Sequence, residues 1–304
     1  MTPAQRGLLL LSCPLGDGIR PLSAAQISSL YRRMAKLSPP ADGNRELTAA
    51  DLAEIGCSEE LSRQILALLD REEMLDFAEI SWKKRRIEVC TRLDPDYPPQ
   101  LLQKLGAEAP VALFLLGDRT LLGTDSISVV GSRQPRPECS DFAVSLGRLA
   151  AKSRLTLVSG DAAGIDRAAQ ESCLALGGPV VSFICDSLIT RKPRKNILYV
   201  SIDGPGCRFT AARALSRNRL IHAQSRAVFA IQPKAGTGGT WSGTKRNLEA
   251  GWSPVWLFDD GSEAVRLLCE AGASTVTAEQ LPALPLFADR KDAHGFHRFF
   301  ARDL

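Results

Sequence analysis

Two strand–glycine–helix units follow one another between residues 127 and 166, and they constrain the fold more than any other stretch. Residues 127–130 and 155–158 are short apolar runs, typical of strands buried on both faces of a parallel sheet. Each run ends in a glycine turn, at residues 131–133 and 159–160, and a helical pattern follows. Both turns are expected to open on the carboxyl edge of one sheet, where doubly wound folds bind ligands.

The composition of the two turns predicts a phosphate site. Glycine turns that lead into helices expose backbone N–H groups beside a helix N-terminus, and this combination attracts anions. An arginine in the first turn adds a guanidinium that pairs with two phosphate oxygens. Asp166 is expected to hold the loop or an arginine, because a carboxylate aimed into the crevice would repel phosphate. The residues predicted to line the site are Gly131, Ser132, Arg133, Ser159 and Gly160.

Strands alternate with helices from about residue 125 to 272, which predicts a parallel sheet covered on both faces. Residues 235–243 are glycine-rich and are expected to form a loop. Residues 1–80 contain helical patterns, with Thr48 and Ser58 as N-caps. The predicted fold is α/β, with a doubly wound, mostly parallel sheet and a small N-terminal all-helical domain. The predicted domains are 1–82 (helix–Gly–helix type), 83–276 (α/β) and a C-terminal tail, 277–304, which is expected to be loosely held from Leu281.

Charge is unevenly distributed along the chain. Residues 187–230 contain nine lysine or arginine residues and one acidic residue, which fits a polyanionic ligand as well as it fits a solvated basic face. Residues 44–80 contain ten acidic and three basic residues, and that surface would repel a phosphate backbone. The N-terminal lobe is therefore expected to be a scaffold or a docking surface for a protein.

Several classes of protein are disfavoured by composition. The 304 residues are 44% apolar and 24% charged, typical of a soluble globular protein, and no apolar run approaches the length of a membrane span. Eight dispersed cysteines without a C-x-x-C pair indicate reduced thiols in the cytoplasm. His294 and His297 lack nearby ligands at metal-binding spacing, so no metal site is predicted. We expect no catalytic residue, because no catalytic constellation is evident from spacing.

Five short motifs follow one another along the chain. They are Tyr97-Pro98, Val130-Gly131-Ser132-Arg133, Ser159-Gly160-x-Ala162-x-Gly164-Ile165-Asp166, Arg217-Asn218-Arg219-x-Ile221 and Gly238-Gly239-Thr240-Trp241-x-Gly243. Together they resemble the DNA-processing protein A family (DprA, also called Smf), over about residues 85–275, and in particular a shorter branch with a Gly-Gly-Thr-Trp loop. The resemblance implies an extended Rossmann-like domain that binds single-stranded DNA as a homodimer and passes it to a RecA-type recombinase in natural transformation. It implies neither a cofactor nor catalysis.

The resemblance also implies which residues hold the DNA backbone. They are Ser132, Arg133, Ser159, Gly160, Arg217, Asn218 and Arg219, and Arg213, Gly164 and Trp241 are further candidates. On a regular helix Arg217 and Arg219 point about 200° apart, so both cannot face one pocket. We expect Arg217 to face the phosphate.

Two other functions compete with single-stranded DNA binding. One is a nucleotide-binding sensor, or an enzyme resembling the nucleoside-monophosphate phosphoribohydrolases, whose loop is similar to residues 238–244 with Glu249 downstream. Glu249 lies five residues after Thr244 instead of three, which argues against that chemistry. The other is a scaffold that acts through its acidic N-terminal lobe.

Overall fold

The computed structural model describes residues 1–37 and 46–287. Contacts divide the chain into two compact units. The first combines Met1–Gly117, Asp186–Pro193 and Tyr199–Phe209, and the second holds the rest of the chain. The domain boundaries expected near residues 82 and 276 stay predictions.

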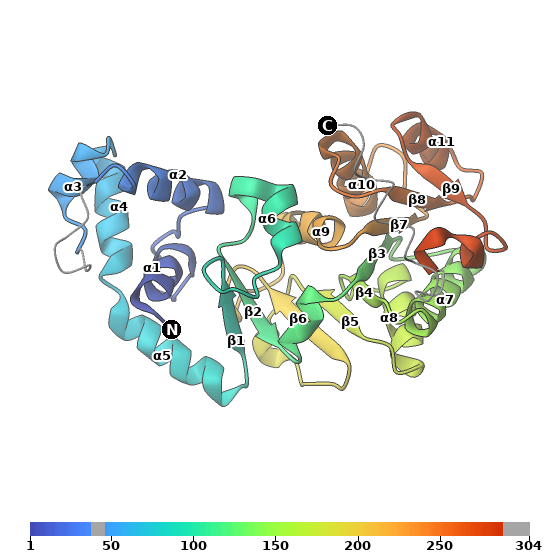
Figure 1. Ribbon diagram of the computed structural model, residues 1–304, viewed down its shortest axis with the longest axis horizontal. Coiled ribbons are helices and arrows are strands. Elements are labelled where there is room, and N and C mark those ends of the chain that lie inside the picture. The colour runs from blue at the N-terminus through green and yellow to red at the C-terminus, as the bar shows by residue number, and fades with distance from the viewer. Residues whose placement is uncertain (38–45, 288–304) are drawn as a thin grey trace. The chain divides into compact units, whose positions relative to one another are not determined.

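The first unit begins with helices whose ends are set by local hydrogen bonds (Figure 1). Thr48 and Ser58 cap α3 and α4, as predicted, each accepting a hydrogen bond from the backbone N–H three residues later. Leu8, Ile27, Leu52 and Ile65 bring the helices together in one apolar cluster. The helices are α1 (Pro3–Ser12), α2 (Ala24–Met34), α3 (Ala49–Glu54), α4 (Glu59–Leu69), α5 (Glu72–Lys84) and α6 (Pro99–Leu105).

Within the described residues, nine strands form one sheet in the order β1-β2-β6-β5-β4-β3-β7-β8-β9. The pairings β1–β2 and β2–β6 are antiparallel, whereas β4, β7, β8 and β9 continue outward from β3 in parallel. The predicted α/β fold with a mostly parallel sheet is confirmed. The strands are β1 (Glu88–Thr91), β2 (Ala112–Leu116), β3 (Ser126–Gly131), β4 (Thr156–Ser159), β5 (Val180–Phe183), β6 (Ile197–Ser201), β7 (Ala227–Ile231), β8 (Val255–Phe258) and β9 (Ser274–Val276).

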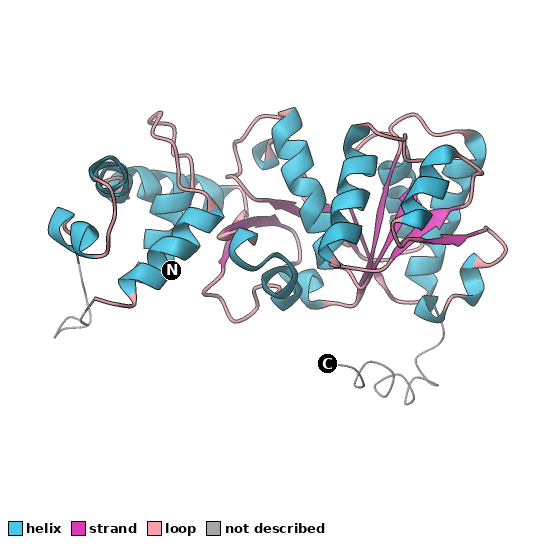
Figure 2. Ribbon diagram, turned by 90° about the horizontal axis from the view of Figure 1, so that it is seen from above, coloured by secondary structure: helices cyan, strands magenta, loops and turns pink. Residues whose placement is uncertain are grey.

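Helices of the second unit cover the sheet in two pairs (Figure 2). Helix α7 packs against α8, helix α9 packs against α10, and both α8 and α9 contact β3. Figure 1 shows the two pairs on opposite faces of the sheet, as a doubly wound fold requires. The helices are α7 (Pro137–Lys152), α8 (Ile165–Ala175), α9 (Ala211–Gln224), α10 (Gly238–Ala250) and α11 (Glu263–Glu270).

One local expectation was wrong. The predicted loop at residues 235–243 ends at Thr237, because Gly238 already begins α10.

The tail from Leu281 was expected to be loosely held. Within its described part, residues 281–287, Leu281 and Phe287 are buried, and the Phe287 ring lies 6.1 Å from the ring of Phe229. Residues 288–304, which include His294 and His297, lie outside the described residues.

Candidate nucleic-acid interface

The glycine turn after β3 lies where the strand order reverses. Strand β3 has β4 on one side and β7 on the other, and the helices that follow β3 and β7 cover opposite faces. The backbone N–H of Ser132 donates to the carbonyl of Ile231, the last residue of β7, at 3.2 Å. The first predicted turn therefore occupies the switch point of the sheet, the usual ligand position in doubly wound folds.

Close packing fixes the shape of this turn. A Cβ atom at Gly131 would lie 2.5 Å from the side chain of Ile165, and one at Gly164 would overlap the backbone of Ser132 and Arg133. Gly164 also has a φ of +84°, which side chains rarely adopt. The N–H of Ile165, at the start of α8, donates to the carbonyl of Ser132 at 3.1 Å. Gly131 and Gly164 thus allow the turn after β3 to pack closely against the start of α8.

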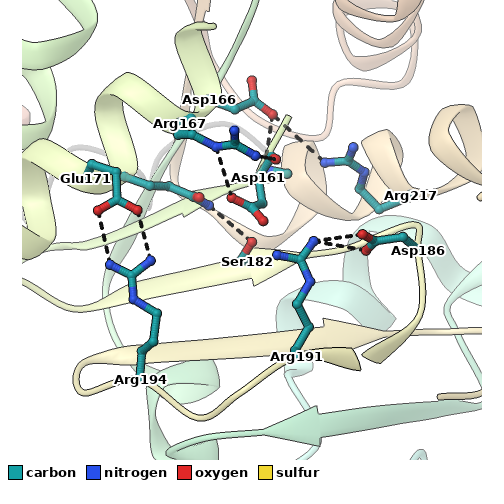
Figure 3. Close-up of polar contacts among 11 residues, drawn as sticks. Asp161, Asp166, Arg167, Glu171, Ser182, Asp186, Arg191, Arg194 and Arg217 are labelled. Carbon is teal, nitrogen blue, oxygen red and sulfur yellow. Dashed lines mark hydrogen bonds and ion pairs between the residues drawn. The ribbon is translucent and has the colours of Figure 1, made fainter. Parts of the chain in front are cut away.

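The carboxylate of Asp166 lies in the second predicted turn (Figure 3). The N–H of Gly160 donates to Asp166 Oδ2 at 3.2 Å, and Arg217 Nη1 lies 4.0 Å from the same oxygen. Burial raises the pKa of Asp166, whereas Arg217 and hydrogen bonds from the loop act in the opposite direction. Asp166 therefore holds both the loop and an arginine, and the N–H of Gly160 already has an anionic partner.

Arg217 lies inside the protein, and only 4% of its surface is exposed. Its guanidinium covers Gly160 so closely that a Cβ atom there would overlap it, and Nη2 lies 3.8 Å from the sulfur of Cys185. The Nε and Nη1 groups have no hydrogen-bond partner among residues 1–37 and 46–287. Arg217 is thus a buried cation directly below the second turn, where the sequence predicted an arginine in contact with phosphate.

The other predicted residues differ in exposure. Ser159 is buried, and its hydroxyl donates to the carbonyl of Val129 at 2.7 Å, so this side chain ties β4 to β3. Arg133 is exposed, while Ser132, Arg213 and Arg219 are half-buried. The accessible positive charge therefore comes from Arg133 on the first turn and from arginines of α9.

Asn218 and Trp241 belong to the contact between α9 and α10. The Asn218 amide donates to the carbonyl of Gly239 at 3.2 Å. A Cβ atom at Gly239 would lie 2.9 Å from the Asn218 amide nitrogen, and one at Gly243 would lie 3.1 Å from His222 Nε2. The glycines of this motif allow the two helices to approach, and Trp241 is half-buried on α10.

Much of the basic segment 187–230 is paired with acids from elsewhere in the chain. Arg191 pairs with Asp186 at 2.8 Å, Arg194 with Glu171 at 2.9 Å, and Arg226 with Asp125 at 2.9 Å; Figure 3 shows the first two pairs. Local charge counted from the sequence therefore overstates the charge that this segment offers to a ligand.

The sequence interpretation missed two residues of the carboxyl edge. Cys185 follows β5 and touches the Arg217 guanidinium. Gln232 follows β7 with a φ of +52°, and its side-chain oxygen accepts a hydrogen bond from the N–H of Arg136 at 2.8 Å. Both lie at the carboxyl ends of parallel strands, so extending the strand-end argument to every strand would have found them.

No group of three or more potential metal-ligating side chains occurs within residues 1–37 and 46–287. None of the helices in the same ranges combines the length and apolarity needed to cross a membrane.

Comparisons with known proteins identify the family. A family model described as DNA recombination-mediator protein A matches residues 88–282. The DNA processing protein DprA of Streptococcus pneumoniae is 30% identical over 255 residues, which are 78% of this chain and 86% of that protein. Protein Smf of Escherichia coli is 29% identical over 203 residues, 60% of this chain and 52% of that protein.

Solved structures agree in fold. The crystal structure of Streptococcus pneumoniae DprA matches with a TM-score of 0.63 at 24% identity, over 86% of this chain and 98% of that one. Helicobacter pylori DprA, described with a single-stranded DNA binding mode, matches with a TM-score of 0.54 at 23% identity, over 64% of this chain and 93% of that one. The resemblance read from the motifs is confirmed, while the Gly-Gly-Thr-Trp branch stays a prediction. The chain belongs to the DNA-processing protein A (DprA/Smf) family of recombination mediators.

Proposed function

We propose that this protein binds single-stranded DNA at the turns after β3 and β4 and along α9, and that it catalyses no reaction. The observation that carries the proposal is the exposed Arg133 on a rigid turn at the switch point of the sheet. Family membership supports the choice of DNA over other anions, as does the DNA-binding mode reported for the Helicobacter pylori relative.

Two kinds of arginine have different roles in this proposal. Arg133 contacts phosphate directly, together with Ser132 and the half-buried Arg213 and Arg219. Arg217 is buried below the Ser159–Gly160 turn, where it pairs with Asp166 and packs against Gly160, so it positions the turn that contacts phosphate. Asn218 keeps α9 in position through its bond to Gly239.

The binding mode is expected to be insensitive to base sequence. The candidate residues are turns and arginines that suit the phosphate backbone of DNA. Binding to this backbone weakens with salt: for single strands, the logarithm of the binding constant falls by about 0.7 per phosphate contact for each tenfold rise in salt concentration. A platform of stacking aromatics is not expected, because aromatic residues are 6% of the chain.

Fluorescence anisotropy with a labelled poly-dT oligonucleotide across a salt series tests the proposal. Arg133→Ala should weaken binding about tenfold or more and lower the salt slope by about 0.7, because one charge-assisted phosphate contact is lost. Arg148→Ala is the matched control, since Arg148 is also exposed in the second unit but lies on α7. Equal affinity for wild type and Arg133→Ala, or no binding at low salt, would refute the proposal.

The role of Arg217 is tested through the glycine that it covers. In Gly160→Ala the new methyl group displaces the Arg217 guanidinium, so we expect weaker DNA binding although every charge remains. Gly123→Ala is the control, because a Cβ atom there meets nothing within 4 Å. Unchanged affinity in Gly160→Ala would show that the position of Arg217 does not matter for binding.

The resemblance also motivates finer proposals for partners. We infer that the protein acts as a homodimer in DNA uptake or recombination and passes its strand to a RecA-type recombinase. The test is recombinase filament formation on a strand pre-coated with a single-strand-binding protein. Filaments should form faster with this protein present, and an unchanged rate would refute the hand-over.

The small-nucleotide alternative gains no support from the position of Glu249. This residue lies in the last turn of α10, 62% of its side chain is exposed, and it pairs with Lys245 at 3.8 Å. In the anisotropy experiment AMP serves as a competitor. Displacement of the oligonucleotide by AMP at the same arginines would favour the alternative.

A further inference from the structure

Helix α5 of the first unit carries an exposed apolar face. Phe77 is 75% exposed, Ile80 is 54% exposed and Met74 is 36% exposed, whereas Leu75 and Trp82 on the same helix are buried. Figure 1 shows α5 running along an edge of the helical part of this unit. Contiguous exposed apolar side chains of this kind usually mark a surface that another molecule covers.

The exposed face has a charge of opposite sign at each end. With 100° per residue, Glu73, Phe77, Ile80 and Lys84 fall within an arc of about 60° on the helix surface. All four are exposed. Along this stripe an acidic residue (Glu73) is therefore followed by two apolar residues and then by a basic residue (Lys84). Its midpoint lies between Phe77 and Ile80.

Such a stripe is complementary to itself when one copy is reversed. We propose that α5 is a docking surface for a second copy of this chain, paired antiparallel about a two-fold axis between Phe77 and Ile80. Phe77 then meets Ile80 of the second copy, and Glu73 meets Lys84 at both ends. A two-fold contact of this type uses the same patch on both partners.

Other features of the helix favour this occupant. Asp76 and Glu79, which lie outside the stripe on the same helix, form ion pairs with Arg6 at 2.7 Å and 2.8 Å, so the partner is selected by the two charges of the stripe, Glu73 and Lys84. A uniformly basic partner would meet Lys84, and a parallel copy would place Glu73 against Glu73. The antiparallel copy is the arrangement that pairs both ends.

The contact is expected to be weak. One pair of helices buries less than the about 1,200–2,000 Å² typical of stable specific interfaces, so association should depend on concentration. The proposed α5 contact does not rest on the proposed DNA binding. It forms in addition to any dimer contact made through another surface.

Charge reversal combined with mixing tests the proposal by sedimentation velocity at increasing protein concentration. Wild type should shift from its smallest species, a 32.9 kDa monomer or a dimer formed through another surface, towards larger species as the concentration rises. Glu73→Lys alone and Lys84→Glu alone should each lose this shift, because like charges then face each other. An equimolar mixture of the two variants should regain it, since every Glu–Lys pair is restored between unlike copies.

The mixture also controls for folding, because misfolded variants could not regain association. Glu54→Lys is a control with the same charge change at an exposed position on α3, and Phe77→Asp should abolish the shift. The proposal is overturned if wild type does not associate, if the two charge variants associate like wild type, or if the mixture behaves like its components. The last outcome would indicate a different occupant of α5.

Discussion

His222 is the residue whose buried state has the clearest consequence for stability. It is fully buried on α9, and neither ring nitrogen has a hydrogen-bond partner in the described part of the chain. Burial lowers its pKa from 6.5 to about 4. Between these values the unfolded chain binds a proton that the folded protein does not, so the free energy of unfolding falls as pH falls.

This linkage predicts the behaviour of His222→Leu. Wild type should lose about 2 kcal/mol more than the variant between pH 7 and pH 5, because the leucine cannot take up a proton in the unfolded state. Urea denaturation at the two pH values measures the difference. Equal losses in both proteins would show that His222 does not titrate as its burial indicates.

At the scale of elements, the contact between α9 and α10 depends on two glycines. In Gly243→Val the new side chain meets His222, whose Nε2 would lie 3.1 Å from the Cβ atom, and α9 must shift. We expect a loss of about 1–3 kcal/mol in the free energy of unfolding and weaker DNA binding, because α9 carries the candidate arginines. Ser242→Val places the same side chain on the exposed face and should change both quantities little.

Strands β3 and β4 and helix α10 show which features could be predicted from the sequence and which could not. The ends of β3 and β4 were predictable, since an apolar run stopping at glycine depends only on neighbouring residues. The start of α10 was not, because glycine disfavours helices and its use here depends on α9, a separate segment. The 239/243 spacing that places both glycines on one face was visible, but the facing helix was not.

Arg217 illustrates a similar limit within the site. Its presence in an arginine-rich helix suggested a surface contact with phosphate. Its burial follows from the approach of α9 to Gly160 and Asp166, which are far away in sequence. Sequence patterns identified the residues of the site, whereas the division into exposed and buried arginines required the packed structure.

For the whole molecule, the division into units predicts how fragments behave. A fragment that ends at Gly117 keeps β2 but lacks β6, which pairs with it through Phe114–Ser201, Leu115–Val200 and Leu116–Tyr199. Without β6 one edge of the buried apolar strand β2 has no partner strand, so we expect aggregation or rapid proteolysis. The full chain under the same protease treatment is the comparison. A soluble, protease-resistant fragment would contradict this expectation.

The chain passes between the two units after Gly117, Cys185, Pro193, Leu198 and Phe209. No single break in the gene therefore separates one unit from the other. Neither unit can be exchanged between related genes as one continuous segment, and a tag or fusion partner is best attached at a terminus. Substitution on an exposed surface, such as α5, changes what this protein can bind without moving either unit.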